Sequence, residues 1–328
     1  MYIRILEIFI YKYTLPAPGV VMKRKISQMG PSSLVVSLPS KWVKRHGVKK
    51  GDEIHVDEKA GELHLKLDGT KSSRVLSVDV SQAGSMINRM LCSVYKAGVD
   101  EVTIKFDNAQ ELHVLQDTLA RTCQTFEIMS IGKNTMQVKS VSELNPDEFD
   151  QILRKMSQTV NTIADEALEA IKTKDYESLK QLELHDKMVD RHTDFLRRTL
   201  NSGKAHHHEL PCALYVICEQ TEILADIYKK LIIDMYTKQK EMSKEELKLF
   251  AQINELLRTF YSALHEFSNE KIIELGKKEV SIRKEIDRIS ELSTTHPKTF
   301  SYLVNLFETG FEMKSALMTY KWGNYGVQ

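Results

Sequence analysis

Apolar residues recur at helical spacing from about residue 145 to residue 320, and this periodicity constrains the fold most strongly. In the first segment Ile152, Met156, Val160 and Ile163 follow one another at intervals of three or four, which is the period of one helix face. Pro146 precedes this segment and is typical of a first helical position. No strand signal interrupts the region. The sequence therefore predicts a helical domain over residues 145–328.

The predicted helices form two successive groups of three. After the first helix we expect helices over about 175–200 and 210–236, and then over 243–267, 269–292 and 297–320. Ser243 with Glu246 three positions later is a capping box, which marks a helix start. The two groups, about 145–240 and 241–322, indicate an internal duplication and a bundle of six helices.

Residues 73–144 alternate between strand and helix signals instead. We expect strands over 74–80 and 101–106, helices over 85–97 and 109–123, and a hairpin from 127–131 and 135–141. This pattern predicts a small α/β domain. Its role stays open among dimerisation, ligand binding and simple spacing.

Residues 22–72 are strongly basic at their beginning. The net charge of the whole chain is only +1, yet no acid interrupts the bases between residues 22 and 50. The bases in this segment are Lys23, Arg24, Lys25, Lys41, Lys44, Arg45, Lys49 and Lys50. Such a charge asymmetry points to a polyanionic partner. Short strands are expected over 33–38, 53–56 and 62–67, and a short helix over 40–46 that ends at Gly47.

This segment resembles the SpoVT/AbrB-type DNA-binding domain, a swapped-hairpin β fold. The resemblance rests on the basic opening, Gly30, the strand ending in Leu38-Pro39, the bases on the short helix, Gly47-Val48 and Gly51-Asp52. It implies an intertwined homodimer that binds double-stranded DNA. The residues that would contact DNA are Lys23, Arg24, Lys25, Ser32, Lys41, Lys44 and Arg45. The family often has an arginine just after the glycine, and this chain departs from that pattern with Pro31, which cannot read a base edge as an arginine does.

A domain of about 50 residues buries little apolar surface alone, so a second copy is expected to complete its core. The other interpretation of the basic segment is a solvated face that binds nothing, or a domain that only dimerises the protein.

Acidic pairs stand four positions apart on two of the predicted helices. They are Asp186 with Asp190, and Glu222 with Asp226. Like charges at this spacing repel, and a cation between the helices would remove the penalty. Carboxylate oxygens suit Mg, Mn, Fe or Zn, as divalent or trivalent ions. The other interpretation is a solvated acidic stripe that binds no metal.

These strings resemble the acidic motifs of PhoU proteins, which regulate phosphate uptake. The resemblance covers about residues 145–320 and implies metal binding at the four acids. In the second repeat Asp287, Glu308 and Glu312 correspond, but Arg283 stands where an acid is expected. We therefore predict one competent metal site and one weaker site, in which Arg283 forms a salt bridge.

The remaining signals are weaker. His206, His207 and His208 are adjacent in the sequence, so they are poorly placed to share one ion. The four cysteines have no CxxC spacing, so we expect them to be buried free thiols. They are Cys92, Cys123, Cys212 and Cys218. Free thiols in turn indicate a reducing cytoplasm. No apolar run is long enough for a membrane span, and residues 1–21 are expected to be a disordered extension without a signal peptide.

Taken together, the segments resemble archaeal PhoU-related proteins with an AbrB-type front. The resemblance implies a cytoplasmic transcriptional regulator of phosphate uptake. The alternative is an accessory protein that binds the ATPase subunit of a phosphate transporter without contacting DNA. A metalloenzyme is not expected, because only His185 and His192 stand near the paired acids, and the sequence has neither a nucleophile elbow nor a Gly-rich phosphate loop.

Overall fold

The structure is a computed structural model that describes residues 23–59, 62–67, 73–141, 146–202, 210–292 and 296–323. The chain divides into an N-terminal unit, Met1–Lys71, and a C-terminal unit, Ser72–Gln328. The C-terminal unit holds both the predicted α/β domain and the helical domain. The predicted extension 1–21 and the three adjacent histidines lie outside the described residues.

The described part of the N-terminal unit forms two hairpins with a short helix between them. Strands β1 (Ser27–Met29) and β2 (Ser33–Val35) pair antiparallel, as do β3 (Ile54–Lys59) and β4 (Glu62–Leu67). Helix α1 (Ser40–His46) ends at Gly47, whose φ of 64° is the left-handed conformation that glycine tolerates. The prediction of Gly47 as the helix end is confirmed.

The strand predicted over 33–38 is shorter in the structure. It ends at Val35, because its partner β1 is only three residues long and was not predicted. None of the described residues of this unit is buried within the single chain. Large apolar side chains are instead exposed, namely Ile26, Met29, Leu34, Val35, Val36, Val56, Leu63 and Leu65.

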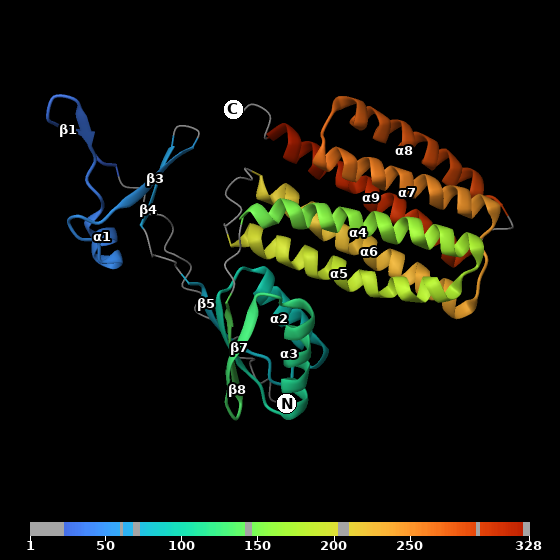
Figure 1. Ribbon diagram of the computed structural model, residues 1–328, viewed down its shortest axis with the longest axis horizontal. Coiled ribbons are helices and arrows are strands. Elements are labelled where there is room, and N and C mark those ends of the chain that lie inside the picture. Colours follow the sequence, from blue (N-terminus) through green and yellow to red (C-terminus); the bar gives the residue numbers. More distant parts are fainter. Residues whose placement is uncertain are drawn as a thin grey trace, which may run out of the picture. The chain divides into compact units, whose positions relative to one another are not determined.

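The α/β part of the C-terminal unit follows the predicted order. A four-stranded sheet has the order β5 (Val75–Asp79), β6 (Glu101–Lys105), β8 (Thr135–Ser140) and β7 (Phe126–Ile131). Strands β5 and β6 are parallel, and the other pairs are antiparallel. A 3-10 turn (Gly84–Met86) leads into α2 (Ile87–Lys96), which packs with α3 (Ala109–Thr122) on one face of the sheet (Figure 1). Buried and exposed residues alternate along β8, as expected for a sheet covered on one side.

Six long helices follow among the described residues of this unit (Figure 1). The first three are α4 (Pro146–Thr173), α5 (Tyr176–Asn201) and α6 (Pro211–Lys238). The second three are α7 (Lys244–His265), α8 (Asn269–Ser290) and α9 (Pro297–Gly323). All six contribute to one apolar core, and the predicted mainly helical character of this region is confirmed. The capping box of Ser243 and Glu246 is present at the start of α7.

The two helical groups meet through α4, α6, α7 and α9. Gly310 on α9 lies directly against Leu257 on α7, and any side chain at position 310 would overlap that leucine. Helix α8 contributes only Leu275, Ile282 and Ile289 to the buried core. It therefore packs mainly against α7 at the edge of the bundle. None of the described helices is long and apolar enough to cross a membrane.

The α/β part is attached to α5 by arginines. Arg198, which is fully buried, donates hydrogen bonds of 2.8 Å to the backbone carbonyls of Tyr95 and Val99. Its guanidinium also lies 4.8 Å from the Tyr95 ring centroid. Arg74 donates to the carbonyl of Asn201 at 2.9 Å, and Arg191 donates to the carbonyl of Arg121 at 2.9 Å. These contacts hold the α/β part on the C-terminal half of α5.

Candidate functional site

Six carboxylates face one another where α5 packs against α6, and we call them the acid ladder. They are Asp186, Asp190, Asp194, Glu219, Glu222 and Asp226. Residues four positions apart lie on one face of a helix, which aligns the three aspartates along α5. The four metal ligands predicted from sequence all belong to the ladder. The structure therefore brings them into one electrostatic cluster.

A lysine neutralises one end of the acid ladder. Lys229 Nζ donates a 2.6 Å hydrogen bond to Asp186 Oδ2 and lies 4.0 Å from Asp226 Oδ1. Asp186 is buried, and its other oxygen, Oδ1, has no hydrogen-bond partner within the described residues. Burial raises the pKa of Asp186, as do Asp226 and Glu183, whereas Lys229 opposes the shift.

An arginine neutralises the other end. Arg197 is fully buried and donates to Asp194 at 2.7 Å, and it also pairs with Glu219 and Glu222. Burial disfavours its charge, but the three acids outweigh burial and raise the pKa of Arg197. Lys96 on α2 lies 3.7 Å from Asp194, so this end of the ladder also touches the α/β part.

Asp190 lies between these two ends. Its carboxylate makes no hydrogen bond or ion pair within the part of the chain that the structure describes. Burial, together with the charges of Asp186 and Glu222, raises the pKa of Asp190 to about 7. A proton or a bound cation would relieve the same repulsion. Asp190 is therefore the position where the ladder is least neutralised.

The ladder has the donor chemistry for a hard or borderline cation. Six acids face three cationic side chains (Lys96, Arg197 and Lys229) among the described residues, so negative charge is in excess. The unpartnered Asp186 Oδ1 is a further available oxygen. As the side chains lie, no group of three or more His, Cys, Asp or Glu within the described ranges is arranged to hold a metal. Lys229 would have to swing away for Asp186 and Asp226 to share an ion.

The sequence analysis assigned four of the six acids as ligands and did not predict that Arg197 and Lys229 neutralise them. Arg197 is three positions after Asp194, and Lys229 is three positions after Asp226, which is the spacing of helix ion pairs. That signal was present in the sequence. The contacts across α5 and α6 were not, because they depend on the rotation of each helix.

The weaker second site contains the predicted salt bridge. Arg283 Nη1 donates to Glu308 at 2.8 Å, and Nε donates to Glu279 at 3.0 Å. Its guanidinium also lies over the rings of Phe307 and Phe311. Asp287 and Glu312 are exposed. The arginine therefore occupies the position that a cation would need.

The predicted DNA-contacting residues are all exposed in the N-terminal unit. Lys41, Lys44 and Arg45 lie on α1 at the spacing of one helix face. Lys23, Arg24 and Lys25 precede β1, and Ser32 lies in the turn between β1 and β2. None of the six basic side chains forms an ion pair with another described residue. They are available to an external polyanion.

The prediction that all four cysteines are buried is wrong. All four are free thiols, but only Cys123 and Cys218 are buried, and Cys92 is half-buried. Cys212 is exposed because it stands in the first turn of α6, where the helix begins at the bundle surface.

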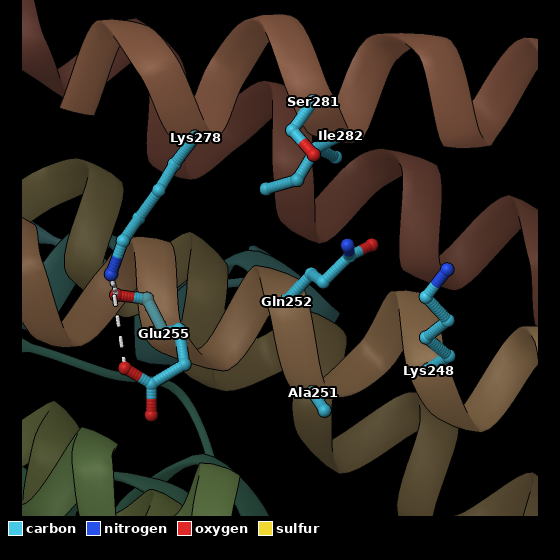
Figure 2. A pocket seen from close by; sticks show the side chains of 7 residues that line it. All are labelled: Lys248, Ala251, Gln252, Glu255, Lys278, Ser281 and Ile282. Atoms are coloured by element: carbon cyan, nitrogen blue, oxygen red, sulfur yellow. Dashed lines mark hydrogen bonds and ion pairs between the residues drawn. The ribbon is translucent and has the colours of Figure 1, made fainter. Parts of the chain in front are cut away.

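A hollow of about 330 Å³ lies between α7 and α8 (Figure 2). Lys278 closes one side by donating to the backbone carbonyl of Glu255 at 3.3 Å and pairing with its carboxylate at 3.8 Å. Gln252 carries a buried amide oxygen without a partner among the described residues. The polar residues expose mainly their aliphatic carbon atoms to the hollow, and they bring no set of reactive groups together. We therefore interpret the hollow as a groove between two packed helices.

Comparison with known proteins gives a limited result. No protein-family model matches the chain, and no curated protein sequence matches it. Among solved structures, the phosphate transport system regulatory protein PhoU from Streptococcus pneumoniae is similar at 14% identity, with a TM-score of 0.43. The match covers 55% of this chain and 96% of that chain.

Proposed function

We propose that the protein is a dimeric, DNA-binding regulator of phosphate uptake that works in the cytoplasm and catalyses no reaction. The observation that carries the proposal is the N-terminal unit, in which exposed bases and exposed apolar side chains occur together. The bases suit a nucleic-acid backbone, and the apolar residues suit a second copy of the same unit.

The exposed apolar side chains of the N-terminal unit support the proposed dimerisation. Leu34 is 72% exposed and Leu63 is 68% exposed in the single chain. A folded unit this small gains too little from burial to leave such side chains in water. A second copy, paired through these residues, would cover them and double the basic surface. The two-hairpin arrangement agrees with the swapped-hairpin resemblance of the sequence.

The exposed charges support the proposed DNA binding. Neutralisation of DNA phosphates by lysine and arginine releases condensed counterions, which supplies most of the affinity. Lys41, Lys44 and Arg45 offer such contacts from one face of α1, and Ser32 could donate a hydrogen bond to a phosphate oxygen.

The link to phosphate uptake rests on the resemblance of the acid pairs to the PhoU motifs. We propose that the ladder holds a divalent or trivalent cation through Asp186, Asp190, Glu222 and Asp226. A bound ion would neutralise the ladder and fix α5 against α6. The weaker site at Asp287, Glu308 and Glu312 would stay closed while Arg283 is paired with Glu308.

Genome-wide mapping of the bound DNA, in cells grown at high and at low phosphate, tests this function. We expect enrichment upstream of phosphate-transporter genes that changes between the two conditions. A flat profile in both conditions would contradict the proposal.

An accessory role at a phosphate transporter is the second candidate. It is favoured by large apolar side chains exposed on the bundle, including Leu184 and Met188 on α5 and Val216 and Ile223 on α6. Such residues suit a protein partner such as the ATPase subunit. Co-purification with that subunit, lost in Leu184→Glu but kept in Lys180→Gln, would favour this role over the DNA-binding one.

A further inference from the structure

A polar groove lies where α4, α7 and the end of α9 meet. It consists of two adjoining hollows of about 200 and 300 Å³ that share Arg154 of α4 and His265 of α7. Lys321 of α9 lines the second hollow, and Arg258 lines the first. Each hollow exceeds the roughly 30 Å³ that one water molecule occupies in the liquid, so there is room for a small ligand.

Cationic groups are concentrated in this groove. Burial lowers the pKa of His265, and the charges of Arg154 and Lys321 lower it further. Burial also lowers the pKa of Lys321, and Arg154 again contributes. His265 and Lys321 are half-buried, Arg154 is exposed beside them, and the positive charge of Arg154 disfavours the protonated form of both.

The acids around the groove do not balance these charges. Among the described lining residues Asp150 is the acid, and it opposes the shifts in the pKa of both His265 and Lys321. Arg258 is already held by Asp165 at 2.5 Å and by Glu255 at 3.6 Å. Glu266 is held by Lys271 at 3.5 Å. Arg154 makes no hydrogen bond or ion pair with any described residue. Positive charge is therefore in excess.

Helix ends explain only part of this charge. His265 and Lys321 stand in the last turns of α7 and α9, where the carbonyl ends favour cations. Arg154 stands about two turns inside α4, where no such effect applies. It is an exposed side chain that lines both hollows.

The hydrogen bonds within the groove show which side chains still have a donor for a ligand. Ser157 Oγ donates to the carbonyl of Leu153 at 2.9 Å, so its proton is used. His265 Nε2 lies 3.0 Å from Ser157 Oγ, and the tautomer with its proton on Nε2 donates to that oxygen while the serine proton is on the Leu153 carbonyl. Protonation of His265 would place a second donor on Nδ1. Gln158 and Asn161 line the same hollow with amide groups that make no hydrogen bond within the described residues.

We propose that this groove binds a phosphate-type oxyanion, either inorganic phosphate or the phosphoryl group of a small metabolite. A guanidinium offers two parallel donors to such an oxyanion, and Lys321 and protonated His265 add charge. Asp150 at the edge can accept a hydrogen bond from the P–OH group that phosphate retains near neutral pH and that sulfate lacks. As an effector site the groove deepens the regulatory function proposed above and rests on it for its biological meaning.

The test is titration calorimetry of the full chain with inorganic phosphate, sulfate and glycerol 3-phosphate at constant ionic strength. We expect one site per chain that prefers phosphate to sulfate by about tenfold or more, a difference of about 1.4 kcal/mol. Tighter binding of phosphate than of glycerol 3-phosphate would identify the free ion, and the reverse would identify a phosphorylated metabolite. No binding of either, or equal binding of sulfate, would overturn the proposal.

Variants locate the site. Arg154→Gln should weaken phosphate binding by about tenfold. Lys155→Gln, the exposed neighbour on the same helix, is the matched control and should bind as the unchanged protein does. His265→Asn should remove the strengthening expected as pH falls from about 7.5 to about 6. An Arg154→Gln protein that melts normally and binds phosphate unchanged would contradict the assignment. None of these measurements uses DNA, so they fail or succeed separately from the DNA-binding function.

Discussion

Arg197 and Arg198 are neighbours in the sequence, but their guanidinium groups contact different parts of the protein. Arg197 pairs with Asp194, Glu219 and Glu222 in the acid ladder. Arg198 donates to backbone carbonyls of the α/β part at Tyr95 and Val99. One turn of α5 therefore carries both the ladder and the attachment of the α/β part. Because Arg197 and Arg198 are adjacent on α5, a change in the charge of the ladder acts directly beside the contact that holds the α/β part.

Replacement of Arg198 should loosen the α/β part. Arg198→Met leaves two buried carbonyls without donors, so we expect a loss of about 2–3 kcal/mol in the free energy of unfolding. Urea denaturation measures this loss, and amide exchange should speed up in α2. Arg191→Met removes an exposed arginine from the same contact and should cost less than about 1 kcal/mol. Equal costs for the two variants would contradict the role given to Arg198.

The ladder should make stability depend on pH through Asp190. Because the folded-state pKa is about 7, above the ordinary 3.8, the folded protein holds a proton that the unfolded chain has released. The free energy of unfolding of the metal-free protein should therefore fall as pH rises from about 4 through about 7. Asp190→Asn should remove part of this slope and be the more stable protein at pH 8. Urea melts in EDTA across this range measure it, and superimposable profiles of the two proteins would refute it.

The second repeat should be convertible into a metal site. Arg283→Asp removes the cation that pairs with Glu308 and restores an acid near Asp287 and Glu312. We expect the number of manganese ions bound per chain to rise from about one to about two. Asp190→Asn, which removes a ligand of the proposed ladder site, is the control and should lower that number by about one. Metal analysis after dialysis measures both. An unchanged ratio in Arg283→Asp would show that the arginine is not what closes the second site.

How far the sequence predicts this structure depends on the range of each interaction. Helix ends were predictable because their signals are local, as with Ser243 and Glu246, or with Gly47. The same Glu246 also accepts a 3.0 Å hydrogen bond from the backbone of His296, fifty positions away, and no local pattern predicts that contact. The acid pairs were likewise visible as i, i+4 spacing, whereas their neutralisation by Arg197 and Lys229 depends on how α5 and α6 pack.

In the N-terminal unit the sequence predicts more strand than the structure contains. The β-branched run 33–38 reads as a longer strand than the structure contains, because a strand needs a partner and β1 supplies only three residues. Within the single chain Val36 is exposed and lies outside any strand. A second copy would supply the missing partner under the proposed function.

The exposed apolar residues of the N-terminal unit should control the oligomeric state. Leu34→Lys places a charge where the proposed second copy packs, so the full chain should change from dimer to monomer. Light scattering after size-exclusion chromatography measures the mass. Ile273→Lys alters a similarly exposed apolar residue on α8 and should leave the dimer intact. A dimer that survives Leu34→Lys would place the interface elsewhere.

The salt dependence of DNA binding tests the central claim most directly. Fluorescence anisotropy of the full chain with duplex DNA from its own upstream region should show affinity that falls steeply with sodium chloride. Removing two charges in Lys44→Gln/Arg45→Gln should reduce the slope of log affinity against log salt by about 2 per bound subunit, whereas Lys180→Gln/Lys187→Gln should leave it unchanged. Absence of binding in dilute salt, or equal slopes for the two double variants, would contradict the account.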